Sequence, residues 1–292
     1  MPMYPQWSVE PLQIWHLVPW VIISTVCFLL WVNRRGWGRD VIFAVGFFFL
    51  MLLPVLGFLN FSFMMISWVS DHFLYVPMIG LIAVAVSAWT NFFQSKQRSV
   101  QLISNAFIFC VITTNILLSH SYAKCWTSAK SLWTYTLGKN DNAWQAHYVI
   151  GCMEVVERKI SSGIKHLEKA STLKPNDRKV QLRFAKVLLA NGEPQRAASI
   201  LEKVTDGGNP HVMETLIESW VKIGKNAKAI KASEEILAVN PANRLVRLHR
   251  ARAFLNMGDT ESAKKEYGIL LEIDYDNQEA KDGIAKALLL EK

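Results

Sequence analysis

Apolar residues follow two different patterns along this chain, and the change falls near residue 120. Before that point, long apolar runs that carry almost no charge cover residues 14–32, 41–59, 73–93 and 102–119. A helix needs about 20 mostly apolar residues to cross the hydrocarbon layer of a membrane. The runs therefore predict four transmembrane helices in residues 1–119, which form the first of two predicted domains.

A regular spacing of small and large residues replaces the long apolar runs in the second part of the chain. The small residues recur at intervals of 34, 34, 32 and 34 residues, at Ala129, Gly163, Ala197, Ala229 and Ala263. Four positions after each of them come Trp133, Leu167, Leu201, Ser233 and Tyr267. Prolines at 175, 210 and 241 close successive units, and Gly192, Gly224 and Gly258 fall between paired helices. This rhythm resembles the tetratricopeptide repeat (TPR), a helix pair that stacks into a solenoid.

The repeat boundaries follow from this spacing. Complete repeats are predicted at residues 144–177, 178–209, 210–243 and 244–277, after a half-repeat at 124–138 that pairs with the end of the fourth span. The last repeat departs from the pattern at Arg250 and Tyr275, where leucine and proline are usual. Residues 278–290 should cap the open end of the solenoid. The predicted fold is all-α, with a TPR superhelical solenoid in residues 120–292.

The basic residues of the short loops predict how the chain is oriented in a membrane. Arg34, Arg35 and Arg39 follow the first span, and Lys96 and Arg98 follow the third, whereas residues 60–72 contain no lysine or arginine. Short loops rich in lysine and arginine stay in the cytoplasm. We therefore expect the solenoid on the extracytoplasmic side, which is periplasmic or lumenal.

Charge and cysteine content exclude some functions. The chain has 32 Lys/Arg and 24 Asp/Glu, and subtracting the five and three in residues 1–119 leaves 27 and 21 for the rest, an excess of six. These charges alternate in sign, as on solvated helices, so no nucleic-acid partner is expected. The four cysteines have no metal-ligand spacing, and whether Cys125 and Cys152 form a disulfide stays open.

A group of polar and helix-bending residues stands at the outer start of the third predicted span. It consists of Asp71, His72, Tyr75, Pro77 and Gly80. Ionisable residues at this depth are functional candidates, because they are costly in lipid unless they meet water or a partner. The alternative interpretation is that Asp71 caps the helix while His72 and Tyr75 lie at the membrane interface.

A second candidate site is the concave face of the solenoid. The residues predicted to face it are Tyr148, Lys179, Lys186, Glu214, Glu218 and Arg252, interleaved with Leu182, Leu189, Leu248 and Leu255. Such a mixed surface suits an extended peptide of a protein partner. The alternative is that these are ordinary solvated side chains.

The order of parts and the sequence of residues 71–80 resemble a known family. Asp-His-Phe-Leu-Tyr-Val-Pro-x-x-Gly is similar to the (Glu/Asp)-Arg-Tyr-Leu-Tyr-Leu-Pro-Ser-x-Gly motif of the transmembrane-and-TPR O-mannosyltransferases, and closer still to bacterial membrane TPR proteins of that kind. The resemblance implies a GT-C glycosyltransferase fold and a polyprenyl-phosphate sugar donor. It covers only the carboxy-terminal half of such an enzyme, without the outward loop that carries the catalytic acid. His72 also replaces the motif's arginine, and histidine is a weaker phosphate partner.

Two functions from different classes follow. The first is a membrane-anchored TPR interaction or scaffold protein without a cofactor, such as an accessory subunit of a larger membrane complex, derived from a GT-C glycosyltransferase. The alternative is the carboxy-terminal half of a protein O-glycosyltransferase, in which Asp71, His72 and Tyr75 help to bind a lipid-linked sugar donor. Because no complete nucleophile, metal or acid/base group is recognisable, we expect the chain not to be catalytic by itself.

Overall fold

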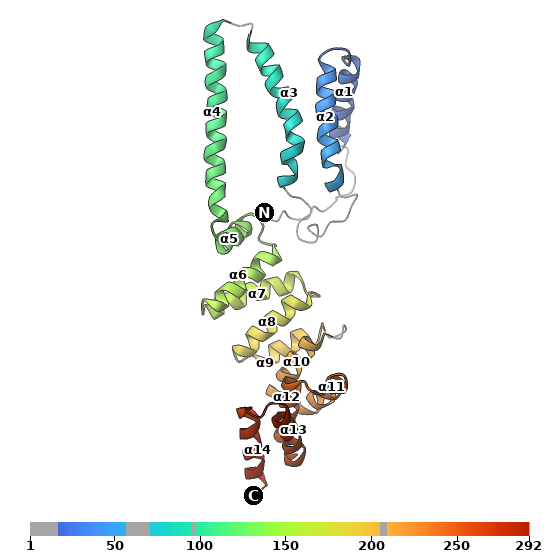
Figure 1. Ribbon diagram of the computed structural model, residues 1–292, viewed down its shortest axis with the longest axis vertical. Coiled ribbons are helices and arrows are strands. Elements are labelled where there is room, and N and C mark those ends of the chain that lie inside the picture. Colours follow the sequence, from blue (N-terminus) through green and yellow to red (C-terminus); the bar gives the residue numbers. More distant parts are fainter. Residues whose placement is uncertain (1–16, 57–70, 95–96, 205–208, 292) are drawn as a thin grey trace. The chain divides into compact units, whose positions relative to one another are not determined.

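The computed structural model describes residues 17–56, 71–94, 97–204 and 209–291, and within these ranges the regular elements are all helices. The chain forms two compact units, Met1–Ala143 and Trp144–Lys292. Figure 1 shows the helices of each unit in chain order. The all-α prediction is therefore confirmed for the described part of the chain.

Long apolar helices make up most of the first unit. They are α1 (Val18–Val32), α2 (Gly38–Leu52), α3 (Tyr75–Gln94) and α4 (Arg98–Ala123). The short 3-10 turn η2 (Leu53–Val55) follows α2, η4 (Asp71–Leu74) precedes α3, and η5 (Lys124–Trp126) follows α4 and leads to α5 (Ala129–Lys139). Three helical stretches, Gly38–Val55, His72–Phe93 and Arg98–Trp126, are long and apolar enough to cross a membrane by length and composition.

The four predicted spans correspond unequally to these helices. The third predicted span, residues 73–93, lies within α3 and the turn η4 that precedes it. The fourth, residues 102–119, lies within α4, which begins four residues before that range and ends four residues after it. The described part of the first span is the 15-residue helix α1, which is shorter than a full crossing. Its predicted start at residues 14–16, and the end of the second span at 57–59, lie outside the described residues.

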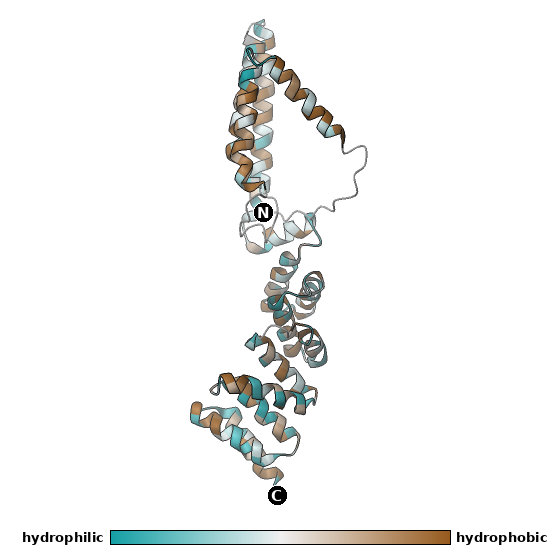
Figure 2. Cartoon of the chain, turned by 90° about the vertical axis from the view of Figure 1, so that its right-hand side faces the viewer, coloured by the Kyte–Doolittle hydropathy of each residue, from teal (hydrophilic) through white to brown (hydrophobic). Residues whose placement is uncertain are grey.

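Packing between the apolar helices relies on small residues and on one polar pair. A Cβ atom on Gly80 of α3 would lie 3.1 Å from Cδ1 of Phe47 and 3.3 Å from the carbonyl oxygen of Ala44, so α3 approaches α2 closely. Between α3 and α4, Nε1 of Trp89 donates a hydrogen bond of 2.7 Å to the hydroxyl of Ser104. Figure 2 shows that these helices carry mainly hydrophobic residues, whereas the helices of the second unit mix both kinds.

The second unit is a series of antiparallel helix pairs. The pairs are α6 (Trp144–Val156) with α7 (Ile160–Leu173), α8 (Arg178–Ala190) with α9 (Pro194–Leu201), α10 (Pro210–Lys222) with α11 (Asn226–Val239), and α12 (Arg244–Asn256) with α13 (Thr260–Ile273). Helix α14 (Gln278–Leu290) packs on α13 at the end of the series. Each pair falls inside one predicted complete repeat, and α14 occupies the predicted cap.

Close helix contacts occur where the repeat pattern places small residues. Gly163, Ala197, Ala229 and Ala263 are buried, whereas Ala129 of the half-repeat is exposed. A Cβ atom on Gly163 would lie 2.9 Å from the carbonyl oxygen of Gly151, so α6 and α7 touch backbone to backbone. The spacing of small residues in the complete repeats therefore marks buried positions of the second helices, and at Gly163 it allows contact between two backbones.

The turns between paired helices use left-handed backbone conformations. Gly192, Gly224 and Gly258 have φ angles of 80°, 80° and 81°. The corresponding residue in the first complete repeat is Arg158, with φ of 62°. A residue with a Cβ atom is strained in this region, which glycine adopts freely. The first complete repeat therefore keeps the same turn without the residue that suits it best.

Candidate functional site

The residues at the start of α3 separate into an exposed group and a packed group. Asp71 begins η4, and its side chain lies outside the described residues. His72 is exposed and its ring lies 4.1 Å from that of Phe73, centroid to centroid, while Tyr75 is 73% exposed. His72 and Tyr75 are thus accessible at the start of the helix.

Pro77 and Gly80 of the same motif have a different environment. Pro77 is almost fully buried, and Gly80 lies at the contact of α3 with α2 described above. Their place in the motif is therefore accounted for by helix packing. The role predicted for the motif as a whole, at a lipid phosphate or an interface, stays a prediction.

A groove runs along the first helices of successive repeats and continues onto α14. Its larger cavity has a volume of about 520 Å³ and its smaller one about 280 Å³. The first is lined from α10, α12, α13 and α14, and the second from α8, α10 and α12. Glu218, Lys222 and His249 line both cavities, so the two form one continuous surface. A further cavity of about 230 Å³ adjoins it, sharing Lys186 and Ala190 of α8.

Four of the six predicted groove residues line these cavities. Lys186, Glu214, Glu218 and Arg252 do so, as do the predicted leucines 189 and 255. Tyr148 and Lys179 line none of the three. Tyr148 packs against the core of its repeat beside Cys152, and Lys179 is exposed in the first turn of α8. The structure thus gathers four of the candidates at one surface, and their binding role stays a prediction.

Sequence reasoning missed the part of the groove that α14 supplies. Glu279, Asp282 and Lys286 line the larger cavity, although residues 278–290 were expected only to cap the solenoid. Lys222 was also missed, although it follows Glu218 by four residues and therefore lies on the same helix face. That spacing was the available signal.

His249 is a buried polar residue that lines both larger cavities of the groove. Its side chain is 6% exposed, and Nδ1 has no hydrogen-bond partner among the described residues. Burial lowers the pKa of the ring to about 4, with Arg252 and Lys222 acting in the same direction and Glu218 and Glu279 opposing them. His249 is therefore uncharged at neutral pH.

A buried ion pair explains the unusual Arg250. Glu266 of α13 is 3% exposed and accepts hydrogen bonds of 2.9 Å from Arg247 and 2.7 Å from Arg250. Arg250 occupies the position where leucine is usual because α13 provides a carboxylate beneath it. Among the described residues, His, Cys, Asp and Glu form no group of three that could hold a metal ion.

Comparisons with known proteins identify the class of the second unit. Residues 223–287 match the tetratricopeptide repeat family model. A tetratricopeptide repeat protein from Parabacteroides merdae aligns over 60% of this chain and 72% of its own, with 14% identity and a TM-score of 0.51. The second unit therefore has the fold of a TPR solenoid.

Other solved structures align less closely. The MamA protein covers 51% of this chain and 82% of its own, with 19% identity and a TM-score of 0.46. YrrB, described as a TPR protein with an unusual peptide-binding site, covers 56% and 94%, with 14% identity and a TM-score of 0.43. No curated protein sequence matches the chain. These comparisons give no support to the resemblance to O-mannosyltransferases.

Proposed function

We propose that the chain is a membrane-anchored TPR protein whose groove holds an extended segment of a partner protein. The observation that carries this proposal is the continuous groove along α8, α10, α12 and α14, with cavities of about 520 and 280 Å³. Its lining combines apolar and charged side chains, as a polypeptide with mixed side chains requires. The partner is one that shares the membrane, such as another subunit of a membrane complex.

Support for a membrane anchor comes from the exposed surface of the first unit. Phe43, Ile103 and Phe109 are 76%, 71% and 70% exposed, and many neighbouring apolar residues on α1 to α4 are exposed as well. A contiguous apolar surface of this kind is unfavourable in water and marks contact with lipid or with protein. The length and composition of Gly38–Val55, His72–Phe93 and Arg98–Trp126 favour lipid. The basic loops favour an extracytoplasmic solenoid.

The alternative function is the carboxy-terminal half of a glycosyltransferase that uses a polyprenyl-phosphate sugar donor. It rests on the resemblance of residues 71–80 to the mannosyltransferase motif. The packing roles of Pro77 and Gly80 explain two of the five motif residues without a donor. We therefore place the interaction protein first.

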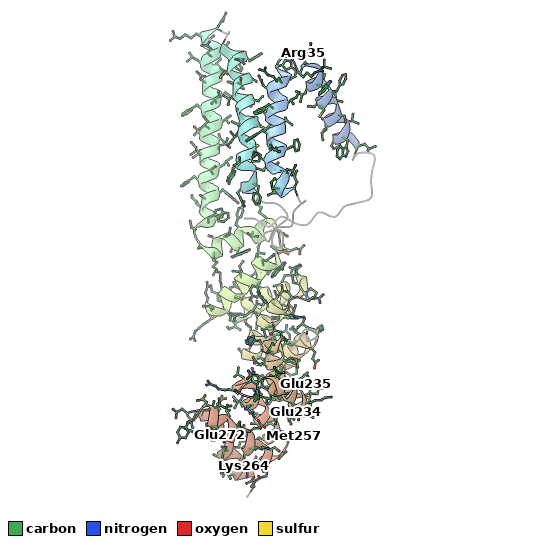
Figure 3. All side chains as sticks on the ribbon, turned by 45° about the vertical axis from the view of Figure 1, so that its right-hand side comes forward. Arg35, Glu234, Glu235, Met257, Lys264 and Glu272 are labelled. Atoms are coloured by element: carbon green, nitrogen blue, oxygen red, sulfur yellow. The ribbon has the colours of Figure 1, made fainter. Side chains whose placement is uncertain are left out.

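Site-specific photo-crosslinking of the full chain in its native membranes tests the proposal. A photo-crosslinking amino acid at Asn256, which lines the larger cavity, should give an adduct of defined mass with a partner protein. The same amino acid at Glu234, an exposed residue of the outer helix α11, is the matched control and should give none. Figure 3 labels Glu234 and Glu235 on this helix. Identical adducts at both positions, or none at Asn256, would contradict the proposal.

A further inference from the structure

Charged side chains of both signs line the three cavities of the groove. The cations are Arg183, Lys186, Lys222, Arg252 and Lys286, and the acids are Glu214, Glu218, Glu279 and Asp282. By formal charge the two sets nearly balance. What a partner meets depends on which of these charges are already engaged within the protein, because a paired charge offers much less to a ligand.

Every acid in this set already has a partner from within the protein. Glu218 pairs with Lys222 at 2.8 Å, and Glu279 pairs with Arg252 at 2.9 Å. The other two acids bind polar side chains, since Glu214 accepts a 2.7 Å hydrogen bond from Asn243 and contacts His211 at 3.0 Å, and Asp282 accepts one of 2.9 Å from Gln278.

Three cations of the groove have no such partner. Arg183, Lys186 and Lys286 form no ion pair with a carboxylate among the described residues. The Nε of Arg183 is moreover buried without a hydrogen-bond partner. Arg183 and Lys186 lie on α8, at one end of the groove, and Lys286 lies on α14, at the other. Cations without an ion-pair partner therefore lie at both ends of the groove, whereas the carboxylates of Glu214 and Asp282 each have an oxygen engaged by a side-chain amide.

In the middle of the groove, Glu218 and Lys222 line both larger cavities and are paired with each other at 2.8 Å. His249 lines both larger cavities, and its ring is neutral at pH 7 because burial lowers its pKa. Leu189 lines the smaller cavity and Leu255 the larger one. A ligand that crosses this region meets apolar side chains, a neutral imidazole and the Glu218–Lys222 ion pair, and it meets an unpaired cation at each end.

We infer that the groove selects an acidic, extended polypeptide segment of the partner protein. Carboxylate side chains of the segment meet Arg183 and Lys186 at the α8 end and Lys286 at the α14 end, and uncharged residues of the segment cross His249. The inference rests on the proposed function and adds the chemistry of the partner.

Fluorescence polarisation with the full chain in detergent micelles tests the charge preference. The probes are three fluorescein-labelled peptides of equal length, which alternate leucine and serine with glutamate, glutamine or lysine. The glutamate peptide should bind most tightly, and its dissociation constant should rise with salt. Lys186→Glu and Lys286→Glu should each raise the dissociation constant of the glutamate peptide roughly fivefold, which is the effect expected from the loss of one exposed ion pair. Both substitutions should improve binding of the lysine peptide.

A matched control separates the groove from the overall positive charge of +8. Lys231→Glu reverses an exposed lysine on α11 that lines none of the three cavities, and it should leave binding of the glutamate peptide unchanged. An equal loss with Lys231→Glu would overturn the inference, as would equal or tighter binding of the glutamine or lysine peptide. Failure of all three peptides to bind would also overturn it. Crosslinking at Asn256 decides the proposed function separately, since it does not depend on the charge of the partner.

Discussion

The contact between α14 and the last repeat depends on a glycine beneath an aromatic ring. A Cβ atom on Gly283 would lie 2.3, 2.5 and 2.8 Å from Cζ, Cε2 and Cε1 of Tyr267. Tyr267 is 2% exposed and packs in a cluster with Leu270, Ala280 and Ala287, so its ring has little room to move. Gly283→Ala should therefore push α14 away from α13 and deform the larger cavity, which both residues line.

The expected magnitude combines two opposing effects. Overpacking a well-packed core costs about 1–3 kcal/mol, while replacing glycine by alanine inside a helix gains about 0.5–1 kcal/mol. The net loss of local stability is about 1–2 kcal/mol, which corresponds to roughly tenfold faster amide exchange along α14. Gly268→Ala on α13 is the matched control, because its Cβ atom would meet nothing within 4 Å. That substitution should slow exchange or leave it unchanged.

Hydrogen–deuterium exchange of the full chain, read on the peptides of α14, measures this effect. Tyr267→Leu removes the ring atoms that the new Cβ would meet, so adding Gly283→Ala to that variant should cost nothing further. If Gly283→Ala and Gly268→Ala have the same effect on α14, or if Tyr267→Leu fails to relieve the loss, the packing argument is refuted.

Further predictions concern a turn, a buried histidine and the membrane topology. Arg158→Gly should raise the stability of the first complete repeat by about 0.5–1 kcal/mol, because glycine adopts the φ of 62° without strain; a lower melting temperature would contradict this. Burial disfavours the charged ring of His249, so the stability of the folded chain should be unaffected above the unfolded pKa of 6.5 and should decrease by up to about 3 kcal/mol as the pH falls from 6.5 to about 4. Melting curves of His249→Gln should lack that part of the acid sensitivity, and an unchanged pH profile would argue against it. With Lys139→Cys, a membrane-impermeant thiol reagent should label intact cells; labelling only after lysis would reverse the predicted orientation.

The sequence predicts the repeats well because their signals are local. The recurring small residues Gly163, Ala197, Ala229 and Ala263 are all buried. Because residues at a fixed spacing share one face of a helix, this pattern predicts which face of each second helix packs against its partner. The helices of all complete repeats accordingly fall within their predicted bounds.

The groove is less predictable because it depends on helices that are a repeat apart. Arg252 and Glu279 lie on α12 and α14, and only the stacking of these helices brings them to 2.9 Å. Arg250 likewise looks anomalous in the sequence until Glu266 of the neighbouring helix is placed beneath it. Which charges are paired, and which are left for a ligand, cannot be deduced from periodicity alone.

The motif at the start of α3 shows a different limit. Residues 71–80 stand close together in the sequence, but the helix that begins there turns Pro77 and Gly80 toward packing contacts and leaves Tyr75 exposed. A shared motif therefore combined residues with separate structural roles.

The central claim, that the groove holds a partner segment, is tested most directly by hydrogen–deuterium exchange on the full chain isolated with its bound partner. Exchange is compared before and after the partner is removed with high salt, which weakens contacts between charged side chains. Amides of α8, α10, α12 and α14 should be protected in the complex and should lose that protection after removal, while α11 and α13 should stay unchanged. Equal exchange in both states, or protection confined to α11 and α13, would contradict the claim.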